Sequence, residues 1–172
     1  MKVYQDTQRP FWDNHGTTLK FLLTSVILGF ATILLTTLVW GAYARDPGLW
    51  GMTHAISNRF LRIILAATVL KLLFEAGIFL HLLAGQLSFI KKTAILMTHH
   101  LKNYTIGRWV CGIIGGILLP LIFIVYGHAM PVVVTVSYAV VVWMLVLAGE
   151  FLERYLFFRA VVPLKMPGEK IC

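Results

Sequence analysis

The chain has 172 residues, of which 59% are hydrophobic and 13% are charged, and its mean hydropathy is +0.82. These values exclude an ordinary soluble domain and indicate an all-α integral membrane protein. The formal net charge of +8 is scattered over short connectors rather than gathered on one basic face, so it favours a membrane-orientation signal over nucleic-acid binding.

Four membrane helices are predicted in chain order. After a polar segment over residues 1–20, residues 21–43 carry no charge and are long enough to cross a hydrocarbon core of about 30 Å. Residues 62–83 form the second apolar stretch. The uncharged run over residues 109–149 is too long for one crossing, and "YGHAMP" predicts a turn that divides it into spans at 109–126 and 132–158. The sequence therefore predicts a four-helix membrane domain over residues 21–158, followed by a C-terminal tail over 159–172.

Basic residues are unevenly distributed between the two sides of this bundle. Three lie in the first connector, namely Arg45, Arg59 and Arg62. Eleven lie on the other side: Lys2, Arg9, Lys20, Lys91, Lys92, Lys102, Arg108, Arg154, Arg159, Lys165 and Lys170. Because positive charge is retained on the cytoplasmic side, both termini are predicted to be cytoplasmic.

The second span contains three polar side chains that need an explanation. Lys71 and Glu75 lie four residues apart on one helix face, close to the middle of the span, where a charge is costly unless it is paired or hydrated. A mutual salt bridge that fixes helix packing fits this spacing, and so does a proton relay or a contact with a polar substrate. His81, about two turns further on, is either a structural hydrogen-bonding residue or a ligand.

The third and fourth spans carry signals for packing. Gly112 and Gly116 form a small-xxx-small pair that lets another helix come close. On the fourth span, Glu150 lies about 27 Å beyond Val132, which places it in the cytoplasmic headgroup region. The spacing of Glu150 and Arg154 predicts an ion pair along one face, with Glu153 on an adjacent face, and hence an anchor at the membrane surface.

No catalytic centre is predicted in the chain. Only His81 lies inside a predicted span, so a haem held by two imidazoles between the helices is not expected. Cys111 and Cys172 lack a metal-binding spacing, and the sequence contains no phosphate-binding loop or nucleophile constellation. We therefore expect no catalytic residue, no metal site and no directly bound cofactor.

Three segments resemble a known family over nearly the whole chain. They are "VYQDTQRPFW…TTLKFLLTSVILG", "KKTAILMTHHLKNYTIGRWVCGIIGGILLPL" and "AGEFLERYLFFRAVVPLKMPG". They resemble the second half of the membrane anchor subunit of dimethyl sulfoxide reductases, within the wider polysulfide reductase and NrfD-like group. The resemblance implies a haem-free, eight-helix anchor in a bacterial or archaeal plasma membrane. Such an anchor holds an iron-sulfur subunit and a molybdopterin catalytic subunit and oxidises menaquinol or ubiquinol in anaerobic respiration.

The chain matches only the carboxyl-terminal half of such an anchor, whereas the quinol site of related anchors lies mainly in the amino-terminal half. The resemblance thus implies a fragment or one product of a split gene, with a separate amino-terminal four-helix half as a partner. It also implies that Glu150, Glu153, Arg154 and Tyr155 of the closing motif are packing or interface residues. The competing hypothesis is a small proton-coupled transporter that uses Glu75 and dimerises through Gly112 and Gly116.

Overall fold

The protein is helical throughout the residues that the computed structural model describes, which are 15–44, 46–80 and 89–159, and no strand occurs among them. Three stretches are long and apolar enough to cross a membrane: Thr18–Ala44, Lys102–Ala129 and Val132–Arg159. The chain is therefore a helical membrane protein. In order, its elements are α2 (His15–Ala44), α3 (Pro47–Leu80), α4 (Phe89–Thr98), α5 (Lys102–Ile113), η2 (Ile114–Leu118), α6 (Leu119–Tyr126), η3 (Gly127–Ala129) and α7 (Val132–Arg159).

Helix α3 is longer than the second predicted span. It starts at Pro47 rather than near Arg62, and its 34 residues include Arg59 and Arg62, which were expected in a connector. The start is capped by Asp46, whose Oδ1 accepts a hydrogen bond of 2.9 Å from the backbone N–H of Gly48. An acidic cap followed by Pro at the first helical position is a strong helix start. Helix α3 is not among the three stretches that meet the length and apolarity requirements for crossing.

The third predicted span is a composite of α5, η2 and α6 that already begins at Lys102. Its central segment η2 is a π-helix over Ile114–Leu118. Pro120 follows directly, and because proline has no N–H and its ring collides with the carbonyl four residues earlier, a regular α-helix cannot continue through this point. The widened turn accommodates the proline without ending the helix. The preceding short helix α4 was not predicted.

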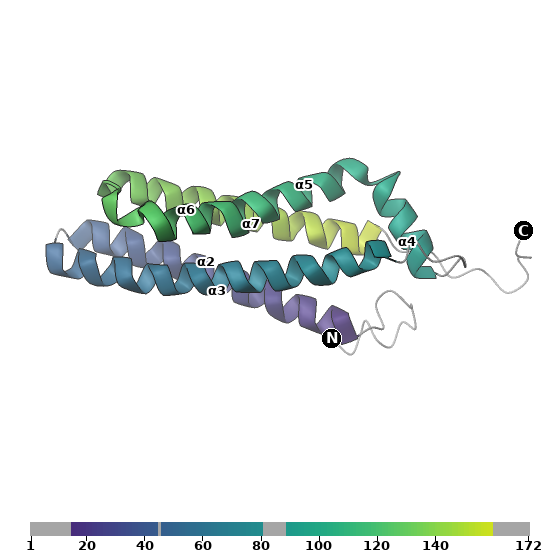
Figure 1. The fold of residues 1–172 in the computed structure, drawn as a ribbon, viewed down its shortest axis with the longest axis horizontal. Coiled ribbons are helices and arrows are strands. Elements are labelled where there is room, and N and C mark those ends of the chain that lie inside the picture. The colour runs from purple at the N-terminus through teal and green to yellow at the C-terminus, as the bar shows by residue number, and fades with distance from the viewer. Residues whose placement is uncertain (1–14, 45, 81–88, 160–172) are drawn as a thin grey trace, which may run out of the picture.

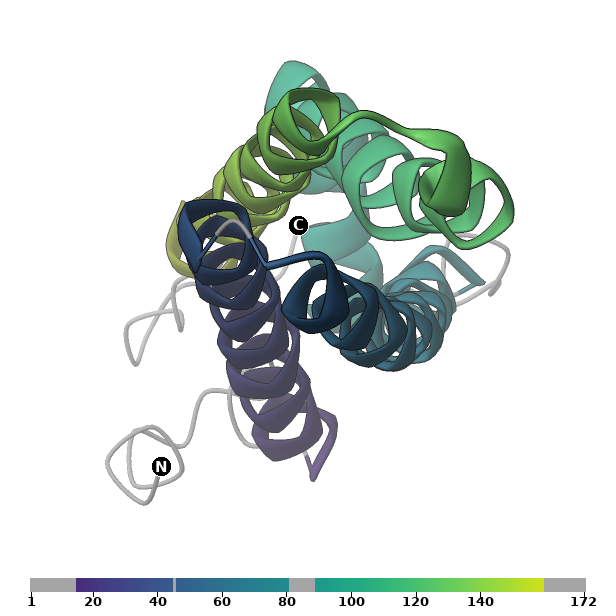
Figure 2. The same ribbon diagram turned by 90° about the vertical axis from the view of Figure 1, so that its left-hand side faces the viewer.

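The helices form an elongated bundle in which α2 and α3 lie side by side in opposite directions (Figure 1). The rings of Phe30 and Phe60 are 5.5 Å apart, so these two residues lie at the same level of the bundle. The start of α2 and the end of α7 lie at one end, which we call the termini end, and the α2–α3 connection and η3 lie at the other, the hairpin end. Viewed along its length, the bundle has α2, α3, the α5–α6 helix and α7 around a common centre (Figure 2).

The apolar core fills the bundle between these ends. Its most buried members come from all four long helical stretches and include Ile27, Leu34, Leu38, Ile64, Phe123 and Val142. Many large apolar side chains point outward instead, among them Leu22, Ile33, Val125, Val133 and Phe151. Outward apolar side chains on helices of this length are what contact with lipid requires. The interior between the two ends is mainly apolar, with a few buried polar side chains such as His54, Ser57 and Thr135.

Candidate functional site: a buried ion network

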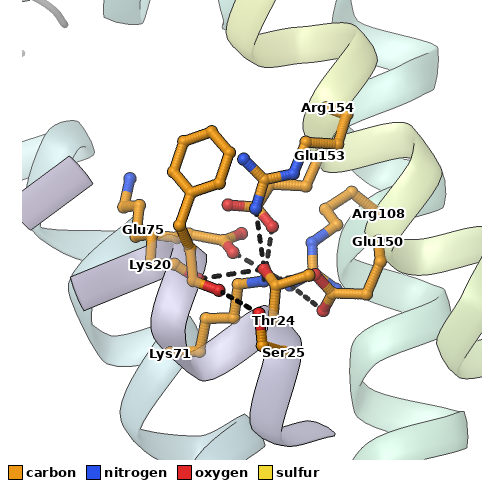
Figure 3. Close-up of polar contacts among 10 residues, drawn as sticks. Lys20, Thr24, Ser25, Lys71, Glu75, Arg108, Glu150, Glu153 and Arg154 are labelled. Carbon is orange, nitrogen blue, oxygen red and sulfur yellow. Dashed lines mark hydrogen bonds and ion pairs between the residues drawn. The ribbon is translucent and has the colours of Figure 1, made fainter. Parts of the chain in front are cut away.

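Five ionisable side chains from three helices meet inside the bundle near its termini end (Figure 3). We call them the ion network. They are Lys71 and Glu75 of α3, Arg108 of α5, and Glu150 and Glu153 of α7. Such a cluster in the interior of a membrane protein is a functional-site candidate, because each charge is costly there without a partner.

Lys71 is the centre of the network and is completely buried. Its ammonium Nζ forms ion pairs with Oε2 of Glu150 and, at 2.5 Å, with Oε2 of Glu153. It also donates a hydrogen bond of 2.6 Å to Oγ1 of Thr24 on α2. The contacts with Thr24 and Glu150 are hydrogen bonds, whereas the contact with Glu153 is an ion pair only.

Arg108 forms the second half of the network and is 3% exposed. Its Nη2 donates to Oε1 of Glu75 at 2.9 Å and lies 3.6 Å from Oε1 of Glu150. Glu150 thus contacts both cations, one with each carboxylate oxygen. The network therefore connects α3, α5 and α7 through charge-assisted contacts, which are stronger than hydrogen bonds between neutral groups.

Thr24 links the network to α2. Its hydroxyl accepts hydrogen bonds from Lys71 and, at 2.8 Å, from Nη2 of Arg154, and donates one of 2.9 Å to the carbonyl of Lys20. A hydroxyl offers one donor and two acceptor positions, and all three are used. The guanidinium of Arg154 also stacks on Phe21, with its carbon 3.5 Å from the ring centre. Figure 3 shows Thr24 in the middle of these residues, with Arg154 on one side of it and Lys71 on the other.

The network marks one boundary of the apolar part of the bundle. From Thr24 to Ala44 and from Val132 to Glu150 the helices rise about 27–30 Å, which equals the thickness of a hydrocarbon core. Because Lys71 contacts Glu150, the two lie at one level of the bundle, so the headgroup position expected for Glu150 and the mid-membrane position expected for Lys71 cannot both hold.

Two ion pairs expected from helical spacing are replaced by contacts between helices. Lys71 and Glu75 are not each other's partners: Lys71 pairs with α7 and Glu75 pairs with Arg108. Glu150 likewise pairs with Lys71 and Arg108, while Arg154 contacts Thr24. Glu150 is 4% exposed, so it is an interior residue rather than a surface anchor.

Arg108 was missed as a site residue because it was counted among the basic residues of a connector. Two nearby glycines, Gly112 and Gly149, indicate that its side chain lies in the interior. A Cβ atom at Gly112 or at Gly149 would lie 3.1 Å from Nη1 of Arg108. Glycine at both positions leaves room for the guanidinium between α5 and α7. Residues 108 and 112 lie on the same helix face because they are four positions apart, so a glycine at 112 leaves space beside Arg108.

The glycines of the third stretch also bring helices together. Gly116 lies against Thr68 of α3, where a Cβ atom would come within 2.7 Å of the threonine Oγ1, and Gly112 lies against Leu72. Both therefore face α3 of the same chain. Gly115, which was not singled out from the sequence, faces α7, and its Cβ would lie 2.6 Å from Cβ of Leu145.

The remaining predicted site residues have separate positions. The ring of Tyr155 packs on Tyr104 of α5, with centres 4.6 Å apart. The closing motif of α7 thus contacts α3 through Glu150 and Glu153, α2 through Arg154, and α5 through Tyr155. His81 lies outside the described residues. Within the described ranges, no group of three or more His, Cys, Asp or Glu side chains is arranged to hold a metal ion.

Electrostatically, the five network residues combine two cations with three carboxylates. Full ionisation leaves one excess negative charge, and the flanking Lys20 and Arg154 supply positive charge beside it. An ion set of this kind fixes the relative positions of its helices, because removing one member leaves an uncompensated buried charge.

A search of protein-family models, of curated proteins and of solved structures finds no match for the chain.

Proposed function

We propose that the chain is a membrane anchor subunit of a dimethyl sulfoxide reductase-like molybdopterin oxidoreductase complex. In this role it tethers an iron-sulfur subunit and a molybdopterin catalytic subunit to the membrane and supports electron transfer from menaquinol or ubiquinol in anaerobic respiration. The observation that carries the proposal is the position of the closing motif. The segment most similar to the anchor family, which includes Glu150, Glu153, Arg154 and Tyr155, is also the segment through which α7 contacts the other helices.

An anchor requires a fixed helix arrangement more than it requires a substrate cavity. Buried ions that each have a partner favour such an arrangement, because any shift of one helix would separate charges inside the bundle. Lys71 and Arg108 each contact two carboxylates, so both would lose contacts if α7 moved. Because movement of α7 would break these contacts, the network favours a rigid anchor for other subunits over a transporter, whose helices must change position.

The proposal includes four membrane crossings, with α3 as the fourth, and cytoplasmic termini in a bacterial or archaeal plasma membrane. Helix α3 lies along α2 for most of its length, from Thr53 beside Gly41 to Lys71 beside Thr24. Because α2 is long and apolar enough to cross the membrane, we propose that α3, which lies along it, crosses as well. Arg59 and Arg62 lie within α3 rather than in the first connector, so fewer basic residues remain in the connector at the hairpin end. The larger difference in basic residues between the two sides favours the proposed orientation.

A separate amino-terminal four-helix half completes the proposed anchor and holds most of the quinol site. This chain then contributes helix packing and subunit contacts, with no haem and no catalytic residue of its own. Its charged interior groups serve assembly in this hypothesis.

Purification of the tagged full chain from its native host in mild detergent tests the proposal. We expect the chain to co-purify with polypeptides that contain iron and molybdenum in fixed proportion, and the preparation to oxidise quinol. A tagged membrane protein of similar hydropathy from the same host serves as the control. A preparation without iron and molybdenum, in which the chain is a dimer that moves protons across liposomes, would contradict the proposal and favour the transporter hypothesis.

A further inference from the structure

Two arginines on α3 point away from the bundle. Arg59 and Arg62 are exposed and lie three residues apart, so their side chains share one helix face. Among the residues that the structure describes, neither guanidinium forms an ion pair or a hydrogen bond. They contrast with Lys71 on the same helix, which is fully buried and surrounded by oxygens.

These arginines lie at the level where the neighbouring helices are apolar. Phe60, between them, packs on Phe30 of α2, which is near the middle of the apolar stretch Thr18–Ala44. Along α3 the helix rises about 14 Å from Arg62 to Lys71 in the ion network, and about 18 Å from Arg59 back to its start at Pro47, and both distances exceed what an arginine side chain can span. Snorkelling to a headgroup region therefore does not reach water from this level.

A guanidinium facing lipid at this depth is strongly unfavourable by every measure of membrane insertion. Charged side chains within membrane helices almost always face protein or a water-filled cavity and pair with another group. The rest of the face has the pattern of a helix-packing surface, with exposed residues spaced three and four apart and small residues among them: Met52, Ala55, Ile56, Ile63, Ala66 and Val69. Small residues at such spacing allow two helix backbones to come close.

We propose that this face of α3 docks a transmembrane helix of another polypeptide, which places a carboxylate beside Arg59 and Arg62. Two guanidiniums on one face offer a planar, multi-donor site that matches a carboxylate well. The proposal follows from bilayer energetics and rests on the α3 crossing that is part of the proposed function, but not on the identity of the complex.

A second copy of this chain does not fit as the occupant. Its carboxylates within the described ranges are Asp46 at the hairpin end and Glu75, Glu150 and Glu153 in the ion network. The network level is about 14 Å along α3 from Arg62, and its carboxylates already have cationic partners. Two copies meeting through this face would therefore bring arginines together without a counter-charge. The fitting partner is a different chain with an acidic residue in a membrane helix.

Site-specific photo-crosslinking in native-host membranes tests this docking face. A benzophenone amino acid at Ile63, which is 39% exposed beside Arg62, is compared with one at Val141 of α7, which is 50% exposed. Val141 is a matched control because neighbouring Trp143 donates to Thr32, close to the level of Phe30. We expect Ile63 to give an adduct with one membrane polypeptide, mapped to a helix with Asp or Glu, and Val141 to give no protein adduct.

The charge requirement is tested with the double variant Arg59→Leu/Arg62→Leu. We expect the Ile63 adduct to fall at least tenfold, and to remain in Arg59→Lys/Arg62→Lys. The leucine variant should itself stay folded, with an unchanged or raised thermal midpoint when purified alone, because two unpaired charges leave the bilayer. An adduct with a second copy, an adduct with lipid alone, or a protein adduct unaffected by the leucine substitutions would overturn the proposal.

Discussion

At the scale of single residues, Lys71 depends on α7 rather than on its own helix. Its ammonium contacts Glu150 and Glu153, while Glu75 depends on Arg108. The network therefore divides into two overlapping groups, one around each cation, joined by Glu150. This division determines which substitutions compensate one another.

Replacing Lys71 by Met should be strongly destabilising, by about 3–5 kcal/mol, because two carboxylates lose their ammonium partner. Adding Glu153→Gln should recover much of this loss, since Arg108 remains for Glu75 and Glu150. Adding Glu75→Leu instead should recover little, because Glu153 stays unpaired and Arg108 loses its nearest carboxylate. The measurement is a double-mutant cycle on the thermal stability of the purified chain in lipid nanodiscs. Equal recovery by both second substitutions would show that the assigned partners are wrong.

The sequence singled out Lys71, Glu75 and Glu150 as candidate site residues, but the ion-pair partners predicted for them were wrong. Helical spacing only reports neighbours on one helix, three or four residues apart. The contacts that form the network join residues at least 33 positions apart, and they depend on how each helix is rotated about its axis. Thr24 is hidden for the same reason, because a threonine in an apolar helix usually bonds only to its own backbone.

At the scale of elements, glycine determines how closely the central helix approaches its neighbours. In the α5–η2–α6 stretch, Gly112 and Gly116 face α3 and Gly115 faces α7. The π-turn at Ile114–Leu118 widens the helix at these glycines. One short segment therefore packs closely against two helices at once.

We expect Gly115→Ala to lower stability by about 1–3 kcal/mol, the usual effect of overpacking. The added methyl group would lie 2.6 Å from Cβ of Leu145 and 3.3 Å from the backbone nitrogen of Val146, so α7 would have to move. Gly29→Ala is the matched control, because nothing lies within 4 Å of a Cβ at that position and alanine favours the helix. Thermal midpoints in the same lipid compare the two variants. A midpoint for Gly115→Ala at or above that of Gly29→Ala would refute the close approach.

Helices α2 and α7 could be predicted from their long uncharged runs, and the structure gives helices over those residues. The start of α3 was missed because Arg59 and Arg62 interrupt its apolar pattern, although Asp46 and Pro47 provide a cap signal. Helix α4 has only 10 residues and two lysines, too little apolar periodicity to separate it from a connector.

At the scale of the whole molecule, the bundle has two different ends. The termini end is held by ionic contacts, whereas the hairpin end is closed by a capped start of α3 and by aromatic packing, such as His54 stacked on Phe123 with ring centres 5.3 Å apart. Within the described ranges, Lys20, Lys71, Arg108, Arg154 and Arg159 all lie toward the termini end.

Reporter fusions test this orientation. Alkaline phosphatase, which is active only outside the cytoplasm, should be inactive when fused after Cys172 and active when fused after Met130 at the hairpin end. The expected pattern follows from the retention of basic residues on the cytoplasmic side. A fluorescent protein that matures only in the cytoplasm should give the opposite pattern at the same two positions. Phosphatase activity in the Cys172 fusion together with no activity in the Met130 fusion would contradict the proposed topology and indicate the opposite orientation.

The separation of Lys71 from its carboxylates also has a consequence for biosynthesis. Glu150 is 79 positions later in the chain, so at about 5–20 residues per second the ribosome needs roughly 4–16 s to produce it after Lys71. During this interval the ammonium has none of its anionic partners from α7, and α3 is held by weaker contacts. The contacts that surround Lys71 are therefore complete only after α7 has been made, and a chain truncated before α7 would lack both carboxylates that pair with Lys71.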